Sequence, residues 1–266
     1  MEVMLSESEK LLQQAAREYL EREYPLSQCR VMECDEKGLS PGIWNQMAEL
    51  GWLELPITPE QKADGRNFFD LTLVVEQMGR VLLTEPFIPT IVSALTIMKF
   101  GDMSQRKDLL AQVAHGNLIL TYALLEPGTA LDEKSIRAYG EPYEQSFLLF
   151  GTKTFVPELQ VAGKFLCPVS TPKGITVFIL DVQRHEITAR LIPTMASDRQ
   201  WEIELNRVRA AQGDILGGEG KGWSVVEAIL QYGTCLSSAY AVGAAERTLE
   251  ITKGYAKQRQ QFGRPI

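Results

Sequence analysis

The sequence has few of the residues that build metal centres, disulfide frameworks or membrane spans. Its 266 residues include only two histidines and four cysteines, with no C-x-x-C pair. This scarcity argues against a zinc-type site and predicts reduced thiols in a cytoplasmic protein without a bound metal. No apolar run approaches the ~20 residues needed to cross a bilayer, and the acidic N-terminal segment lacks the basic start of a signal peptide.

The chain also lacks an excess of positive charge. It carries 34 acidic and 27 basic residues, a net charge of -7. We therefore expect no nucleic-acid partner, and a bound polyphosphate would have to be held by a few local cations. The hydrophobic content of 45% and charged content of 23% are those of a globular protein with a substantial core.

The first hundred-odd residues show helical periodicity. Ser6 followed by Glu9 predicts a capping box at the start of an amphipathic helix. Pro86 and Pro89 are expected to break the chain before a later helix begins. Further helices are predicted over residues 41–50, 69–82, 90–100 and 104–113.

After Gly116 the pattern changes to short apolar and β-branched runs, typical of a small β domain built as a barrel or sandwich. Strands are predicted over residues 118–124, 146–150, 164–169, 175–181 and 201–205. Helical periodicity then returns from Lys221 to about Gln261, with small residues that permit close helix approach. The expected domains are a helical domain over 1–115, a β domain over 116–212 and a helical region over 213–266.

Three segments are candidate functional motifs, although each one alone also has an ordinary structural interpretation. Residues 125–132, Leu-Glu-Pro-Gly-Thr-Ala-Leu-Asp, are a sharp turn after a strand. Residues 151–157, Gly-Thr-Lys-Thr-Phe-Val-Pro, place Phe155 either in the core or against a planar ligand. Residues 259–266 end a helix with a solvated arginine. The glycine cluster at 217–222 matches neither nucleotide-binding fingerprint.

Together these segments occur in the order and at the spacings of the acyl-CoA dehydrogenase family, which the chain resembles along its whole length. The resemblance also includes the helix end at 44–52, the Glu-Gln-Met-Gly-Arg helix at 76–80 and the Gly-Lys-Gly-Trp helix start at 220–223. It implies an α+β fold with an N-terminal helical domain, a middle β barrel and the first helices of a C-terminal four-helix bundle.

The resemblance implies FAD as cofactor, an acyl-CoA thioester as substrate and an electron-transfer flavoprotein as electron acceptor. It also implies a homo- or hetero-oligomer, a dimer of dimers, because the arginine and aromatic motif serves the flavin of a neighbouring subunit. In the same chain, the residues implied to face the flavin are Tyr122, Leu124, Leu125, Ala130, Leu131, Phe155 and Pro157. Those implied to reach a neighbour's flavin are Arg259, Gln261 and Phe262.

The sequence departs from the family pattern at the flavin contacts. Leu125, Leu131 and Pro157 stand where hydroxyl residues are usual, and each lost hydrogen bond is worth about 0.5–1.5 kcal/mol. The sequence ends at Ile266, before the family's usual glutamate base, so no catalytic residue is assigned.

Three hypotheses follow from this comparison. The chain is an acyl-CoA dehydrogenase subunit that passes hydride from an acyl-CoA to FAD, or a non-catalytic partner subunit of a mixed oligomer with degenerate flavin contacts. The third hypothesis is an acyl-CoA-binding or protein-binding module without redox activity. Bound flavin, co-purification with a paralogue and flavin-independent CoA binding distinguish the three.

Overall fold

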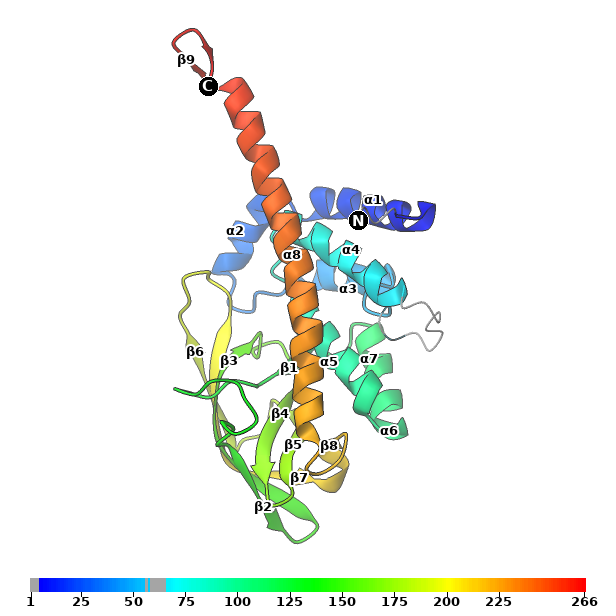
Figure 1. Ribbon diagram of the computed structural model, residues 1–266, viewed down its shortest axis with the longest axis vertical. Helices are drawn as coiled ribbons and strands as arrows, with labels where there is room; N and C mark the ends of the chain where they lie inside the picture. Colours follow the sequence, from blue (N-terminus) through cyan, green and yellow to red (C-terminus); the bar gives the residue numbers. More distant parts are fainter. Residues whose placement is uncertain (1–4, 56, 58–65) are drawn as a thin grey trace. The chain divides into compact units, whose positions relative to one another are not determined.

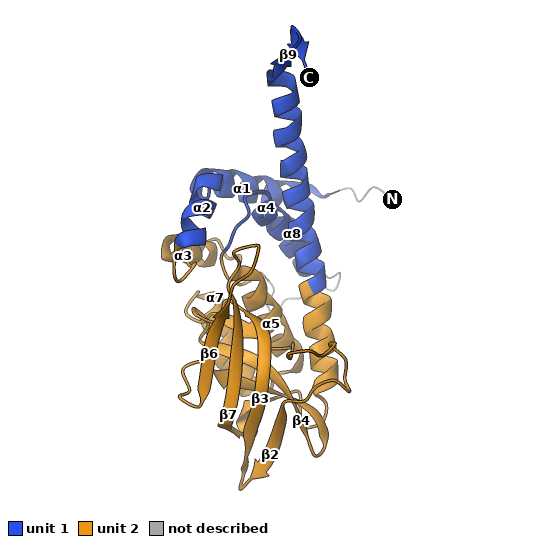
Figure 2. Cartoon of the chain, turned by 90° about the vertical axis from the view of Figure 1, so that its left-hand side faces the viewer, with its two compact units in different colours: residues 1–34, 60–84, 234–266 blue, residues 35–59, 85–233 orange. Residues whose placement is uncertain are grey.

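The computed structural model describes residues 5–55, 57 and 66–266 (Figure 1). The chain divides into two compact units, each assembled from separate stretches of sequence (Figure 2). Unit 1 comprises Met1–Cys34, Glu60–Thr84 and Thr234–Ile266, and unit 2 comprises Asp35–Pro59 and Glu85–Gly233. Across the described ranges, no helix has the length and apolar character that crossing a membrane requires.

Unit 1 is built mainly from helices. They are α1 (Glu7–Glu23), α2 (Leu26–Cys34), α4 (Arg66–Arg80) and the later part of α8 (Gly222–Gln258). The predicted capping box is confirmed: the Glu9 amide donates to Ser6 Oγ at 3.3 Å, and the Ser6 amide donates to Glu9 Oε2 at 2.5 Å. Helix α2 was not predicted, because only Cys29 and Met32 on it are buried, which leaves a weak apolar stripe.

Helices α4 and α8 cross at two glycines. A Cβ atom placed on Gly243 would lie 1.8 Å from the carbonyl oxygen of Glu76. One placed on Gly79 would lie 1.9 Å from the carbonyl oxygen of Tyr240. The two helices therefore meet backbone against backbone, which only residues without a side chain permit. The close approach predicted from the small residues of the last helix is confirmed at Gly243.

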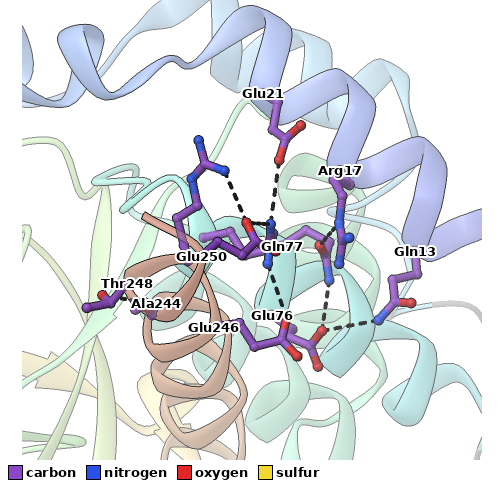
Figure 3. A network of polar contacts seen from close by, with 11 residues as sticks. Gln13, Arg17, Glu21, Glu76, Gln77, Ala244, Glu246, Thr248 and Glu250 are labelled. Atoms are coloured by element: carbon purple, nitrogen blue, oxygen red, sulfur yellow. Dashed lines mark hydrogen bonds and ion pairs between the residues drawn. The ribbon is translucent and has the colours of Figure 1, made fainter. Parts of the chain in front are cut away.

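The Arg80 guanidinium joins three helices beside this crossing. Its side chain is 3% exposed and lies 3.1 Å from Glu246 and 2.7 Å from Glu250, both on α8. A third carboxylate, that of Glu21 on α1, is 3.7 Å away. Figure 3 shows these three glutamates together with Glu76. Because a buried guanidinium is costly without partners, these carboxylates are needed to offset its desolvation.

Unit 2 combines helices with a sheet. Its helices are α3 (Pro41–Glu49), α5 (Phe87–Phe100), α6 (Met103–Gln105), the π-helical turn η1 (Arg106–Leu110), α7 (Ala111–Ala114) and the first turns of α8. Helix α5 begins three residues before its predicted start at Thr90. Pro89 does not prevent this, because it lies in the first turn, where a backbone N–H has no partner within the helix.

The strands of unit 2 form one eight-stranded sheet. They are β1 (Leu120–Tyr122), β2 (Tyr139–Tyr143), β3 (Ser146–Pro157), β4 (Lys164–Thr171), β5 (Gly174–Asp181), β6 (Ile187–Ile192), β7 (Gln200–Ala211) and β8 (Ile215–Leu216). The order is β6-β7-β3-β2-β4-β5-β8, with β1 paired parallel to β4. Strands β2 and β6 were not predicted because nearly all their residues are exposed or half-buried, which removes the alternating apolar signal.

The predicted succession of a helical region, a sheet and a C-terminal helix is confirmed, but a closed barrel is not shown. The sheet path runs from β6 to β8, and the described strand pairs include none that joins these ends. Its core contains Phe147 and Phe178, whose rings meet edge to face with centroids 5.4 Å apart. The C-terminal region supplies one long helix, α8, which ends at Gln258 rather than near Gln261. A short 3₁₀ turn, η2 (Gln212–Asp214), precedes β8.

Candidate functional site

Two of the predicted segments meet at the end of β3. The Thr154 amide donates to the carbonyl oxygen of Leu125 at 2.8 Å, forming an isolated antiparallel bridge. The buried Thr121 hydroxyl donates to the carbonyl oxygen of Pro157 at 2.6 Å. The turn that follows β1 and the last residues of β3 are therefore held side by side by main-chain contacts.

A β-bulge places Phe155 outside the core. The β3–β7 register shifts between Lys153 and Val156. Phe155 has a φ of 52°, a left-handed conformation that is unfavourable for an aromatic residue. Its side chain is 51% exposed, whereas the neighbouring Val156 is fully buried. Of the two positions considered for this aromatic side chain, the core is therefore excluded.

A buried ion pair lies directly behind this bulge. Lys153 Nζ lies 2.7 Å from Glu126 Oε1, and the two side chains are 0% and 5% exposed. The same carboxylate accepts the Arg137 amide at 2.8 Å and the Ala138 amide at 3.1 and 3.2 Å. Glu126 thus closes the loop from 126 to 138 upon itself and attaches it to β3. No single segment of the sequence pointed to this pair.

The remaining predicted residues of this region form an apolar border with one phenol. Leu124 is buried, Tyr122, Leu125, Leu131 and Pro157 are half-buried, and Ala130 and Phe155 are exposed. Burial raises the pKa of the Tyr122 phenol. A Cβ atom on Gly233, in the first third of α8, would lie 3.9 Å from that hydroxyl. An exposed aromatic ring bordered by apolar side chains and a phenol fits a planar, mainly apolar ligand with polar edges.

The third predicted segment forms a β-hairpin in unit 1. Strands β9 (Gln260–Gln261) and β10 (Arg264–Pro265) pair antiparallel across Phe262 and Gly263. Both turn residues have positive φ, 53° and 77°, as a mirror-image hairpin turn requires. Phe262 is 100% exposed, and Arg259 and Gln261 are exposed too. This segment is therefore a projecting hairpin with an aromatic tip, where the sequence had suggested a simple helix cap.

A second buried acidic group, which the sequence did not reveal, lies past the end of β3. Glu85 accepts the Ser40 amide at 3.0 and 3.2 Å, and burial raises the pKa of its carboxyl to about 8. Burial also raises the pKa of Glu158 to about 7, although Gln160 donates to it at 2.7 Å. The Arg199 guanidinium lowers both pKa values and so limits the rise. These residues are too far apart in the sequence to form a motif.

Two domain models of one protein family match this chain. A model of the N-terminal domain of acyl-CoA dehydrogenases matches residues 6–117, and a model of their C-terminal domain matches residues 220–266. The chain belongs to the acyl-CoA dehydrogenase family. Within the described ranges, no group of three or more His, Cys, Asp or Glu side chains could hold a metal ion.

Curated acyl-CoA dehydrogenases are similar over most of this chain. One from Bacillus subtilis (strain 168) is 26% identical over 233 residues, which are 83% of this chain and 61% of that protein. The short-chain specific mitochondrial enzyme of Mus musculus is 24% identical over 277 residues, 99% of this chain and 66% of that protein. The chain therefore spans 61% and 66% of the length of these relatives.

Solved structures agree with the family assignment. A Tcur3481-Tcur3483 steroid ACAD variant is 28% identical with a TM-score of 0.84, covering 97% of this chain and 69% of that one. The FAD complex of PigA is 25% identical with a TM-score of 0.84, covering 100% and 72%. The ChsE4-ChsE5 complex from Mycobacterium tuberculosis, 22% identical with a TM-score of 0.84 over 100% and 71%, shares the fold.

Proposed function

We propose that this chain is the flavin-binding part of an acyl-CoA dehydrogenase subunit that oxidises an acyl-CoA thioester between its α and β carbons. The family match supports this reaction class. The single structural observation that carries the proposal is Phe155, a 51% exposed aromatic side chain at a bulge tied to the turn after β1. A strained, solvent-exposed aromatic residue is costly unless a ligand covers it.

In this proposal, FAD lies against the border defined above, and bound FAD would supply the hydride acceptor for the oxidation. The residues proposed to line it are Tyr122, Leu124, Leu125, Ala130, Leu131, Phe155 and Pro157. The Tyr122 hydroxyl makes no hydrogen bond to the described residues, so it is available as a donor to a polar edge of the flavin. The base that removes the α-proton is assigned to no residue of this sequence.

The C-terminal hairpin is proposed to serve a second subunit. Arg259, Gln261 and Phe262 are exposed on a structure whose turn fixes the direction of the aromatic tip. A guanidinium pairs with pyrophosphate through two parallel hydrogen bonds, which provides the local cation that an acidic chain otherwise lacks. The oligomer would therefore be required for full flavin affinity.

A second candidate function is that of a partner subunit in a mixed oligomer. Leu125, Leu131 and Pro157 offer no side-chain hydrogen bond to a flavin, and a loss of about 0.5–1.5 kcal/mol at each would weaken binding by orders of magnitude. This chain shares its fold with the ChsE4-ChsE5 complex, whose name gives two different components. In this case Arg259 and Phe262 would act on the sibling's flavin.

The two candidates differ in flavin stoichiometry. The protein should be purified in its native assembly, and its visible spectrum and subunit composition by native mass spectrometry should be recorded together. One flavin per chain, with reduction of the flavin by a series of acyl-CoA thioesters, supports the first candidate. One flavin per pair of unlike chains supports the second. A colourless protein that takes up no added FAD contradicts both, and an electron-transfer flavoprotein should be tested as acceptor.

A further inference from the structure

The Glu126–Lys153 pair is the most deeply buried pair of opposite charges described in unit 2. The two side chains are 5% and 0% exposed, and their charged atoms are 2.7 Å apart. Removing two charges from water is expensive, and apolar side chains of the same volume commonly give equal or greater stability. The energetic contribution of the pair to folding is therefore a weak explanation for its presence.

The pair connects the two segments that border the proposed flavin. Glu126 belongs to the turn after β1, and its carboxylate also receives the amides of Arg137 and Ala138 from the far end of the same loop. Lys153 is the last residue in register with β7 before the bulge that carries Phe155. Displacement of either charged group would therefore release the loop, the bulge or both.

Both carboxylate oxygens of Glu126 accept hydrogen bonds from groups of the protein itself. One oxygen receives Lys153 and Ala138, and the other receives Arg137 and Ala138. A carboxylate that accepts several hydrogen bonds of this kind specifies the orientation of each donor, because charge-assisted bonds are short and strongly directional. The side chain is thus suited to fixing a loop and poorly placed to contact a ligand.

We propose that Glu126 and Lys153 are positioning residues, which fix the turn after β1 and the Phe155 bulge in one arrangement before the flavin binds. This inference rests on the proposed function and adds to it the device that pre-forms the site. Pre-organisation matters because a loop that must be ordered during binding consumes part of the binding free energy. Neither residue touches the cofactor, because the contacts of both charged groups lie within the protein.

The test uses the charge-neutral, nearly isosteric double variant Glu126→Gln/Lys153→Met in the full-length protein. Single substitutions leave one buried charge unpaired and can prevent folding, whereas the double variant leaves none. The glutamine keeps one acceptor oxygen for the amides of Arg137 and Ala138, but it is uncharged and its NH2 group stands in place of Oε1, so the 3.1 Å bond from Ala138 and the bond from Lys153 are lost. The control is Leu180→Ala, which opens a cavity in the same sheet core at a residue that makes none of the Glu126 hydrogen bonds.

Three quantities are measured for each protein: the Kd for FAD, the visible flavin absorption band, and amide hydrogen exchange at Arg137 and Ala138 without FAD. The double variant should exchange these amides about tenfold faster, bind FAD about tenfold more weakly and give a less structured flavin band. Leu180→Ala should lower the denaturation midpoint and leave the flavin band unchanged. The exchange rates of the Arg137 and Ala138 amides should stay the same relative to those of the surrounding sheet.

The outcomes separate this proposal from the proposed function. Wild-type protein that takes up no FAD contradicts the proposed function and, with it, the flavin role of the pair. Wild-type protein that binds FAD, while the double variant binds it with the same Kd and the same absorption band, overturns the positioning role alone. A flavin affinity that follows only the denaturation midpoint, equally in the double variant and Leu180→Ala, overturns it as well.

Discussion

Replacement of Gly243 by alanine should destabilise unit 1, even though the same change normally favours a helix. The added Cβ would lie 1.8 Å from the Glu76 carbonyl oxygen, whereas ordinary contacts begin at 3.4 Å. Helices α4 and α8 would have to separate by about 1.6 Å, the difference between these distances. Backbone shifts of this kind cost about 1–3 kcal/mol. The movement would also stretch the 2.7 Å contact between Arg80 and Glu250.

The loss of that contact adds to the cost, because the Arg80 side chain is 3% exposed and cannot easily recover water. Against these terms stands the better helix propensity of alanine, about 1 kcal/mol. The backbone shift and the helix propensity together lower the free energy of unfolding by about 0–2 kcal/mol, and the stretched Arg80 contact increases this loss.

Gly254→Ala is the matched control in the same helix. A Cβ atom at position 254 meets nothing within 4 Å, so only the propensity term remains. This variant should be more stable than wild type by about 0.5–1 kcal/mol. Urea denaturation followed by circular dichroism and tryptophan fluorescence measures both changes. If the two variants change stability in the same direction by the same amount, the proposed backbone contact between α4 and α8 is wrong.

The remaining predictions concern pH, the exposed aromatic residue and the hairpin. The pKa of Glu85 is raised from 4.5 to about 8 in the folded protein, so the stability it contributes is complete below pH 4.5 and is lost as the pH rises through 8. The free energy of unfolding should therefore decrease with pH by at most about 1.4 kcal/mol per pH unit, and Glu85→Gln should reduce this decrease. If plots of the free energy of unfolding against pH are parallel for the two proteins, the prediction is wrong. Phe155→Gly should relieve the positive φ and change the free energy of unfolding by less than about 1 kcal/mol, yet weaken FAD binding roughly tenfold. A large loss of stability would show instead that the ring belongs to the core. Arg259→Lys should raise the Kd for FAD, since lysine cannot form the paired contact with pyrophosphate, and should leave the denaturation midpoint unchanged. Lys257→Arg is the control in the same exposed segment. Equal Kd values would remove Arg259 from the flavin site.

The sequence was informative where a local pattern decides the structure. Ser6 and Glu9 are three residues apart, so their reciprocal hydrogen bonds could be predicted without any tertiary contact. The strands with alternating or continuous apolar residues were also found. By contrast, β6 was missed because its residues are exposed or half-buried, and its strand conformation depends on pairing with β7.

The candidate site was only partly accessible to sequence reasoning. The motifs identified the turn after β1 and the end of β3, but ordinary patterns favoured a core position for Phe155. Its exposure follows from a register shift opposite β7, some 45 residues away in the chain, which no local pattern contains. The Glu126–Lys153 pair and the Glu85 cluster were missed for the same reason, since each joins residues distant in sequence.

The crossing of α4 and α8 also has a consequence for the order of folding. Gly79 and Gly243 are brought together by residues that a ribosome releases many seconds apart, at about 5–20 residues per second. Until the later part of α8 emerges, the face of α4 around Gly79 has no helix packed against it. Arg80 then lacks its ion pairs with Glu246 and Glu250. Unit 2 is complete at Gly233, so during synthesis the sheet can form while unit 1 still lacks its last helix.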